Sequence, residues 1–441
     1  MSTDPLSDER AGGIVGARLG RPPQDLLEAA VVLEAWGGVR SQDALALEAA
    51  LLPARVEPDA MPARWDVEEE EEGRESIVAE GIGLLVAIVA VATWAGPLSR
   101  QLGATTLEQA LRVALPLTLG LQWTIRSRYL GRPSGLRCLA EERGRVLLVL
   151  CMLLLALALA PHVGVLAAVL VLIWVGGTLL ARRGWGLVYA ALVAGEAVAL
   201  AHHVPAARSL VGLATLVFWA CVAAVATAPG PAPTQAPGRL RRALAAGAIG
   251  TLLGFLLIGD HSLGWGVHGA FPGLALAPSV LGSLWGGYYL WQFHAAVPRG
   301  LRGVPLAQAN AQIPGGPAMR ILLGALARLV GVTTALSLLV LAAAPWTEGT
   351  DRPSLFIAFG AVALMCLFVS LHESLGFTRW ALTVAAVSLA VELAIDRLVH
   401  VSTPGVALAG AGTIGALLAL TPLIGQLRSP GRMLATALWI K

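Results

Sequence analysis

Charged residues are scarce in this sequence. Asp, Glu, Lys and Arg make up 13% of its 441 residues, whereas hydrophobic residues make up 56%, and the mean hydropathy is +0.72. This composition leaves too little polar surface to cover a water-soluble globule of that length. The alternation of polar and apolar residues that marks membrane-spanning strands is also absent. We therefore expect an all-α, polytopic integral membrane protein.

Motifs for cofactor chemistry are missing as well. The four cysteines do not form a CxxC pair, and the sequence contains no P-loop, no GxGxxG after a predicted strand, no HExxH and no GxSxG. These absences argue against nucleotide hydrolysis, a bound metal or another cofactor, and they favour a protein that is not an enzyme. The basic residues form no stripe, so nucleic acid is not an expected partner.

Long apolar runs recur from residue 77 onward, most of them near the roughly 20 residues that a helix needs to cross the hydrocarbon core. We predict twelve transmembrane helices, at approximately 77–95, 107–125, 145–160, 163–181, 185–202, 208–228, 241–259, 271–294, 319–344, 354–371, 376–398 and 405–426. Only Pro161 and His162 separate the short third and fourth spans, which leaves counts of eleven and thirteen open. No cleavable signal opens the chain, so we expect the first span to start its insertion.

The arginines indicate the orientation of these spans. With the N-terminus in the cytoplasm, the inner segments hold eighteen basic residues and the outer loops hold four. Because positively charged short loops stay in the cytoplasm, this split predicts twelve spans with both termini cytoplasmic. The expected location is the plasma (inner) membrane, with membrane lipids as partners.

The first 76 residues differ in charge from the rest of the chain. Acidic residues outnumber basic ones by ten in residues 1–76, whereas basic residues outnumber acidic ones by thirteen in residues 77–441. Apolar residues at helical spacing predict two short helices in this cytoplasmic head, at 22–36 and 41–52. The run Asp66–Glu75 (DVEEEEEGRE) is either a solvated spacer or a docking site for a basic cytoplasmic partner or for the Arg-rich loops.

A weak internal repeat divides the membrane region. The loop after the second span reads RPSGLRCLAEE, and the loop after the eighth reads PRGLRGVPLAQA, so that GLR followed by LA recurs six spans later. A duplication of six spans would place the match there, and it predicts halves at 77–228 and 241–426.

Three ionisable residues are predicted to lie deeper within the spans than the others. Glu196 is about 16 Å into the fifth span, and His203 lies two turns farther along the same face. An isolated buried carboxylate suits reversible protonation, or it is a structural residue bonded to a neighbouring helix. Arg328 is about 13 Å into the ninth span. Arg112, in the second span, can pair with Glu108 at i, i+4. Either arginine could bind a phosphate, and Arg328 could instead neutralise Glu196 or Glu80.

A second group of polar residues is predicted at the outer ends of the spans. Glu392, Asp396 and His400 share one face of the eleventh span, whereas Arg397 points elsewhere. His203, Asp260 and His261 end other spans on the same side. We interpret His203, Asp260, His261 and His400 as an outer vestibule, with Glu392 and Asp396 on the substrate or ion pathway. A metal site made from these side chains is chemically conceivable, but no ligand spacing marks one.

The span layout and the polar loop GRPSGLRCLAEERGRVLLVL resemble the polysaccharide and lipid-linked oligosaccharide flippases of the multidrug/oligosaccharidyl-lipid/polysaccharide (MOP) exporter superfamily. The resemblance implies a flippase or exporter of a polysaccharide or lipid-linked cell-envelope precursor that works by alternating access. Under this hypothesis, Glu196 couples transport to a proton or ion, and Arg328 and Arg112 attract an anionic substrate.

Three alternatives remain at this point. The segment RCLAEERGRV is also similar to the GxLADRxGRR loop of the major facilitator superfamily, whose members transport small molecules. A membrane-embedded transferase would use Asp260, His261, Glu392, Asp396 and His400, provided that these side chains converge. A scaffold of envelope polysaccharide assembly would use the acidic head to recruit cytoplasmic enzymes.

Overall fold

The structure is a computed structural model, and it describes most of the predicted membrane region. The described residues are 13–15, 17–18, 32–33, 78, 81–89, 97–130, 135–159, 163–228, 240–259, 273–301, 317–342, 353–374, 377–399 and 403–427. The helices predicted at 22–36 and 41–52 lie outside them, apart from residues 32–33, as does Asp66–Glu75. The predictions for the acidic head therefore stay predictions.

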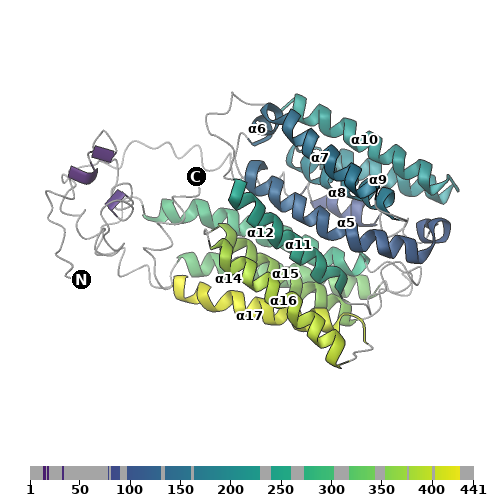
Figure 1. The fold of residues 1–441 in the computed structure, drawn as a ribbon. Coiled ribbons are helices and arrows are strands. Elements are labelled where there is room, and N and C mark those ends of the chain that lie inside the picture. The colour runs from purple at the N-terminus through teal and green to yellow at the C-terminus, as the bar shows by residue number, and fades with distance from the viewer. Residues whose placement is uncertain are drawn as a thin grey trace.

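The described residues form helices and contain no strand, which confirms the all-α prediction. In chain order the helices are α5 (Ala104–Ile125), the π-helix η2 (Arg126–Leu130), α6 (Gly135–Glu141), α7 (Arg143–Ala158), α8 (Gly164–Arg182), α9 (Gly186–Ala201), α10 (Ala206–Ala226), α11 (Leu240–Gly259), α12 (Gly273–Leu301), α14 (Pro317–Ala342), α15 (Pro353–Ser374), α16 (Thr378–Val399) and α17 (Val406–Leu427). A helical stretch at 81–89 lies within the first predicted span. The long helices lie side by side, with α7 to α10 in the upper part of Figure 1 and α14 to α17 in the lower part.

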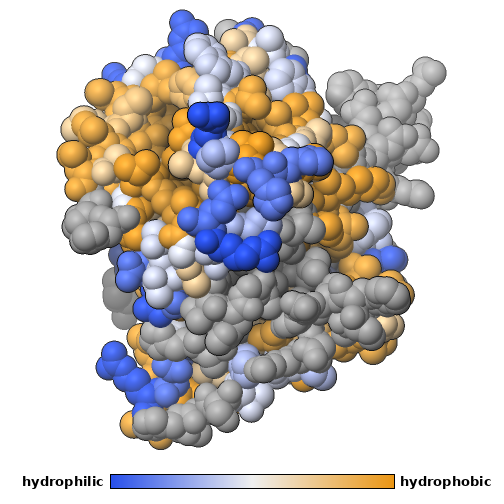
Figure 2. All heavy atoms as spheres, turned by 90° about the vertical axis from the view of Figure 1, so that its right-hand side faces the viewer, coloured by the Kyte–Doolittle hydropathy of each residue, from blue (hydrophilic) through white to orange (hydrophobic). Residues whose placement is uncertain are grey.

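Eleven of the twelve predicted spans coincide with described helices, from α5 for the second to α17 for the twelfth. By length and composition, 6 described helices can cross a membrane: α8, α10, α11, α14, α15 and α17. Large apolar side chains such as Leu148, Val149 and Met152 of α7 are exposed, as expected of a helix that faces lipid. Figure 2 looks onto one end of the bundle, where hydrophilic residues form a patch and hydrophobic residues flank it. These features are those of a polytopic helical membrane protein.

Two helices end in the same hydrogen-bonded turn. After α8, the N–H groups of Gly184 and Trp185 donate to the carbonyls of Ala181 and Leu180. This pattern requires a left-handed residue, and Gly184 provides it at φ 82°. The turn closes α8 and lets α9 return antiparallel to it.

After α9, the residue in the left-handed position is a histidine. The N–H groups of His203 and Val204 donate to the carbonyls of Leu200 and Ala199, and His203 has φ 62°. The helix therefore ends before His203, which corrects the prediction that this residue continues the helical face of Glu196.

One helix is central in each group of helices. In the first group, α8 packs against α5, α7, α9 and α10, and in the second group α15 packs against α12, α14, α16 and α17. The pairs α9 with α10 and α16 with α17 also correspond. In the numbering of the predicted spans, α8 is span four and α15 is span ten. Each contact of the first group recurs between the two spans whose numbers are six higher. A common packing pattern of this kind is expected of an internal repeat.

The two groups of helices meet along two seams. In one seam α5 packs against α11, where Gly247, Gly250 and Gly254 bring the backbones together. In the other, Gly81 of the first predicted span faces α12, because a Cβ added there would lie 3.2 Å from Leu284. The first seam joins spans two and seven, and the second joins spans eight and one. Span eight corresponds to span two, and span seven corresponds to span one. Each seam therefore joins the second span of one group to the first span of the other, as an offset of six spans requires.

Candidate functional site

A buried carboxylate lies where α11 and α16 pack together. Ser388 and Glu392 of α16 both have an exposed fraction of 0%. A Cβ added at Gly259, the last residue of α11, would lie 2.7 Å from Oε2 of Glu392, so the carboxylate lies directly against this glycine. One turn farther, Asp396 is partly buried and Arg397 is exposed. This gradient agrees with the predicted face of the eleventh span, and Glu392 is the more deeply buried of its two carboxylates.

A second buried carboxylate lies between α9 and α10. Glu196 is 6% exposed, and its polar neighbour is Ser209 of α10, itself 7% exposed. Oε1 of Glu196 and Oγ of Ser209 make no hydrogen bond of good geometry with described residues. A buried oxygen without a partner is costly, and such groups mark sites that take up a proton, a water or an ion. Glu196 is therefore a group that a small ligand or a proton would stabilise.

These two carboxylates occupy corresponding helices. The helix of Glu196, α9, packs against the central helix α8, and the helix of Glu392, α16, packs against the central helix α15. The correspondence extends to the seam helices. A Cβ added at Gly83 of the first span would lie 3.1 Å from the backbone of Gly186 in α9, and α11, the seventh span, packs against α16.

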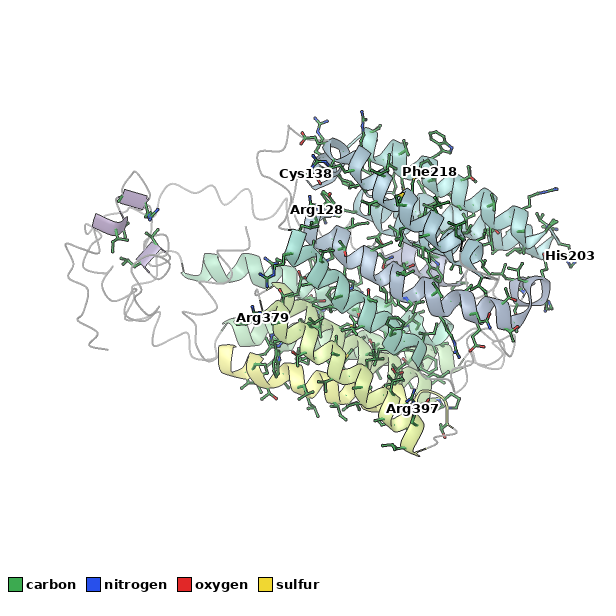
Figure 3. All side chains as sticks on the ribbon, viewed as in Figure 1. Arg128, Cys138, His203, Phe218, Arg379 and Arg397 are labelled. Atoms are coloured by element: carbon green, nitrogen blue, oxygen red, sulfur yellow. The ribbon has the colours of Figure 1, made fainter. Side chains whose placement is uncertain are left out.

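Residues predicted on opposite sides of the membrane lie at opposite ends of the bundle. Figure 3 places Arg128, Cys138 and Arg379 toward one end and His203 and Arg397 at the other. This distribution agrees with the predicted alternation of the spans. We call the end near Arg128, Cys138 and Arg379 the inner end, because the sequence predicts that these residues lie on the cytoplasmic side.

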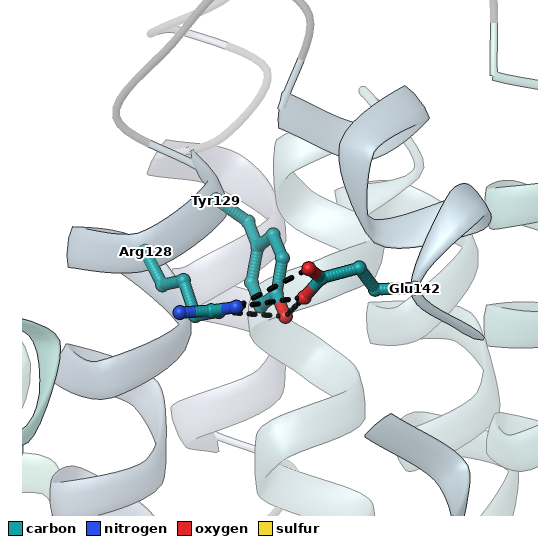
Figure 4. Close-up of polar contacts among 3 residues, drawn as sticks. All are labelled: Arg128, Tyr129 and Glu142. Carbon is teal, nitrogen blue, oxygen red and sulfur yellow. Dashed lines mark hydrogen bonds and ion pairs between the residues drawn. The ribbon is translucent and has the colours of Figure 1, made fainter. Parts of the chain in front are cut away.

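A polar network closes the loop between the second and third spans at the inner end. Arg128 Nη2 donates to Glu142 Oε2 over 2.9 Å, Tyr129 Oη donates to the same oxygen over 2.5 Å, and Arg128 Nε donates to Tyr129 Oη over 2.9 Å. Figure 4 shows all three side chains converging. Arg128 and Tyr129 lie in the π-helix η2, and Glu142 precedes α7. The network thus fixes the course of the chain between α5 and α7.

The network changes the ionisation of its members. Hydrogen bonds from Tyr129 and Arg128 lower the pKa of Glu142. Burial and the bond to Glu142 raise the pKa of Tyr129, and the bonds to Glu142 and Tyr129 raise the pKa of Arg128. At neutral pH, Glu142 is therefore ionised, Arg128 is protonated and Tyr129 is a neutral hydrogen-bond donor.

A second polar contact at the inner end is centred on Glu373 of α15. Ser127 Oγ, from η2, donates to Glu373 Oε1 over 3.4 Å. Arg242 Nη2, from α11, donates to the backbone carbonyl of Glu373 over 2.9 Å, and its Nε lies 3.9 Å from Oε1. This contact joins the first group of helices to the second.

The two predicted intramembrane arginines have other neighbours than the buried carboxylates. Arg112 pairs with Glu108 over 2.7 Å within α5, as predicted. Arg328 is exposed, and its guanidinium stacks over the ring of Tyr289 of α12 at 4.5 Å. No ion pair joins Arg328 to Glu196 in the described part of the chain, so that expected pairing is corrected. Glu80, the other carboxylate considered for Arg328, lies outside the described residues, so that pairing stays a prediction.

Three of the four residues predicted for the outer vestibule, Asp260, His261 and His400, lie outside the described residues. Within the described ranges, no group of three or more His, Cys, Asp and Glu side chains could hold a metal ion. No pattern in the sequence pointed to the contacts of Ser127, Tyr129, Glu142 and Glu373.

Comparisons with known proteins add one distant structural similarity. No protein-family model matches the chain, and no curated protein matches its sequence. A solved structure described as "Crystal structure of MATE in complex with MaL6" matches at 14% sequence identity and a TM-score of 0.43, over 84% of this chain and 98% of that one. At this TM-score the similarity identifies neither the fold nor the function.

Proposed function

We propose that this chain is a secondary transporter of the plasma membrane, in which residues 77–228 and 241–426 form two six-helix halves that alternate access to the two sides. One observation carries the proposal: the helix contacts of the first half recur six spans later, and the two seams between the halves follow the same offset. Internal repeats that rock against each other around a site near the membrane midplane are the usual design of secondary transporters.

Glu196 and Glu392 are the proposed coupling residues. Each is buried on the corresponding helix of its half, at 6% and 0% exposure. A charge inside the membrane is costly, so a carboxylate there is stabilised by taking up a proton or a cation. Uptake and release of a proton or cation at Glu196 and Glu392 would change the charge of each half during the transport cycle.

The proposed substrate is a polysaccharide or lipid-linked envelope precursor that carries a negative charge. The loop GRPSGLRCLAEERGRVLLVL, which resembles the exporters of such substrates, supports this choice. Arg328 keeps its proposed role of attracting the substrate because its guanidinium is exposed beside Tyr289. Arg112 is the weaker candidate, since Glu108 offsets its charge. No step in this proposal requires bond cleavage, so the chain is proposed not to be an enzyme.

A liposome assay tests the proposal. The purified full chain is reconstituted into liposomes that contain a fluorescent polyprenyl-diphosphate-linked sugar, and dithionite is added to quench the probe on the outer leaflet. A flippase makes the inner-leaflet probe accessible as well, so quenching should proceed nearly to completion. Quenching identical to that of protein-free liposomes would contradict the proposal.

The coupling role is tested in the same liposomes. Glu196→Gln and Glu392→Gln preserve shape and remove the charge, so we expect both to slow quenching and to abolish its dependence on an imposed proton or sodium gradient. Glu141→Gln is the matched control, because Glu141 is exposed on α6 and away from both seams. Full, gradient-dependent quenching by both coupling variants would reject these roles.

A further inference from the structure

The inner end of the bundle is held by a contact between residues of different halves. Ser127 belongs to the first half, whereas Glu373 and Arg242 belong to the second. The Glu373 carboxylate accepts from Ser127, and the backbone carbonyl of the same residue accepts from Arg242. The helical turn η2 also packs directly against α11. The end of the second span is thereby joined to the end of the tenth and the start of the seventh.

The position of Ser127 depends on an unusual local backbone. Residues Arg126–Leu130 form a π-helix, a conformation that is rare and occurs mostly as single turns at functional sites. The two residues that follow Ser127 in this turn, Arg128 and Tyr129, are bound to Glu142, and Tyr129 is 5% exposed. The network around Glu142 thus holds the turn that presents Ser127 to Glu373.

The Glu373 contact is also weak enough to break. The side chains of Arg242 and Glu373 are 42% and 18% exposed, and their closest charged atoms are 3.9 Å apart. Partly exposed ion pairs of this kind contribute little to stability. Arg242 thus holds Glu373 from within the second half, and the bond that crosses between the halves is the one from Ser127 Oγ to Glu373 Oε1, which at 3.4 Å is long. A single bond of this kind joins the halves without making their separation prohibitive.

We propose that Ser127, Glu373 and Arg242 form an inner latch, which closes the inner end in this conformation and opens when the halves rock to expose that side. The inference rests on the proposed function only for the movement of the halves. The latch acts by raising the population of the closed inner end. Removing it should favour the open form even when no substrate is present.

Distances between the halves at the inner end test the latch. Spin labels are placed at Arg182→Cys in α8 and Arg379→Cys in α16, two exposed positions in different halves, in a chain whose four cysteines are replaced by alanine. Pulsed electron resonance in lipid nanodiscs then gives the distance distribution. Ser127→Ala removes the bond between the halves and should raise the long-distance population about two- to fivefold, and Glu373→Gln should raise it less, because its amide oxygen can still accept from Ser127.

Glu141→Gln is the matched control, because it removes an exposed carboxylate at the same end without touching the latch. We expect its distribution to match that of the parent. Ser127→Ala is mild enough to test the latch alone should Glu373→Gln fail to fold. The latch is wrong if the folded latch variants keep the parent distribution, or if Glu141→Gln shifts it equally. The measurement needs no transport, so a shift without liposome flux would support the latch and reject the flippase.

Discussion

The two groups of helices, which are the proposed halves, meet in two chemically different regions. In the middle of the bundle, the seam between α5 and α11 consists of backbone against backbone. A Cβ added at Gly247, Gly250 or Gly254 would overlap Thr124, Leu119 or Pro116. At the inner end, the two groups touch through Ser127, whose hydroxyl donates to the Glu373 carboxylate over 3.4 Å. The first region is held by shape, and the second by a polar bond.

This difference separates two mechanical roles. Small residues let helices approach closely in a membrane, where van der Waals packing is the main source of association. Such packing is lost as soon as the helices separate, so the seam is suited to remain closed as a pivot. Polar side chains at the inner end can exchange their bonds for bonds to water. The seam and the latch therefore predict very different responses to substitution.

The largest effect is expected at the seam. Gly254→Ala would place a methyl group against the backbone of Pro116, and neither helix can give way without losing the neighbouring contacts. We expect a loss of about 1–3 kcal/mol in stability, measured as thermal unfolding of the detergent-solubilised protein. Gly212→Ala is the matched control, because nothing lies within 4 Å of the Cβ added there. Gly212→Ala should leave the stability unchanged or raise it by up to about 1 kcal/mol. Equal unfolding temperatures for the two variants would show that the seam is loosely packed.

A smaller effect is expected in the network that supports the latch. Glu142→Gln removes the charge that Arg128 and Tyr129 bind, and we expect a loss of about 1 kcal/mol, because the group is only partly buried. Glu141→Gln, at the adjacent exposed position, should cost nothing measurable. Urea or thermal unfolding of the two variants compares a bound carboxylate with a free one directly.

The pH dependence of the same network has a definite sign. The native pKa of Glu142 is lowered, so its contribution is present above its ordinary pKa of about 4.5 and is lost as the pH falls through the lowered value. The pKa of Tyr129 is raised, so its contribution is present below about pH 10 and is lost as the pH rises through the raised value. The stability difference between parent and Glu142→Gln should therefore be constant at neutral pH and should shrink in strong acid. A difference that persists in strong acid would assign the effect to packing.

The sequence predicted the helices well because membrane insertion depends on a local property. The length of an apolar run decides whether a helix can cross the bilayer, and no distant contact is needed. The prediction of which residues share one face of α16 depended on an equally local property. A rotation of 100° per residue predicts that Glu392 and Asp396 lie together and that Arg397 lies apart, and the structure has Glu392 buried and Arg397 exposed.

The inner latch could not be predicted because it depends on the path of a loop. Arg128 binds Glu142 from within a π-helical turn, and no pattern in RSRYL predicts that turn. Glu373 meets Ser127 across 246 positions of sequence. The pairing of Arg328 with Glu196 was wrong for a related reason, because the packing of α12 against α14 places the ring of Tyr289 beside Arg328. Contacts between helices follow from the arrangement of the halves, which one apolar run does not contain.

The smallest effect is expected for an ion pair that lies in neither region between the halves. Arg112 and Glu108 pair within α5 at i, i+4, and the Arg112 side chain is 43% exposed. Both residues precede the seam residues of the same helix, so Glu108→Gln tests a charge pair without disturbing the contact with α11. We expect a loss of no more than about 0.5 kcal/mol, measured by thermal unfolding, which salt should reduce further. A loss as large as that of Gly254→Ala would mean that charge and shape contribute equally to α5. The division between a packed pivot and a breakable polar end would then have to be abandoned.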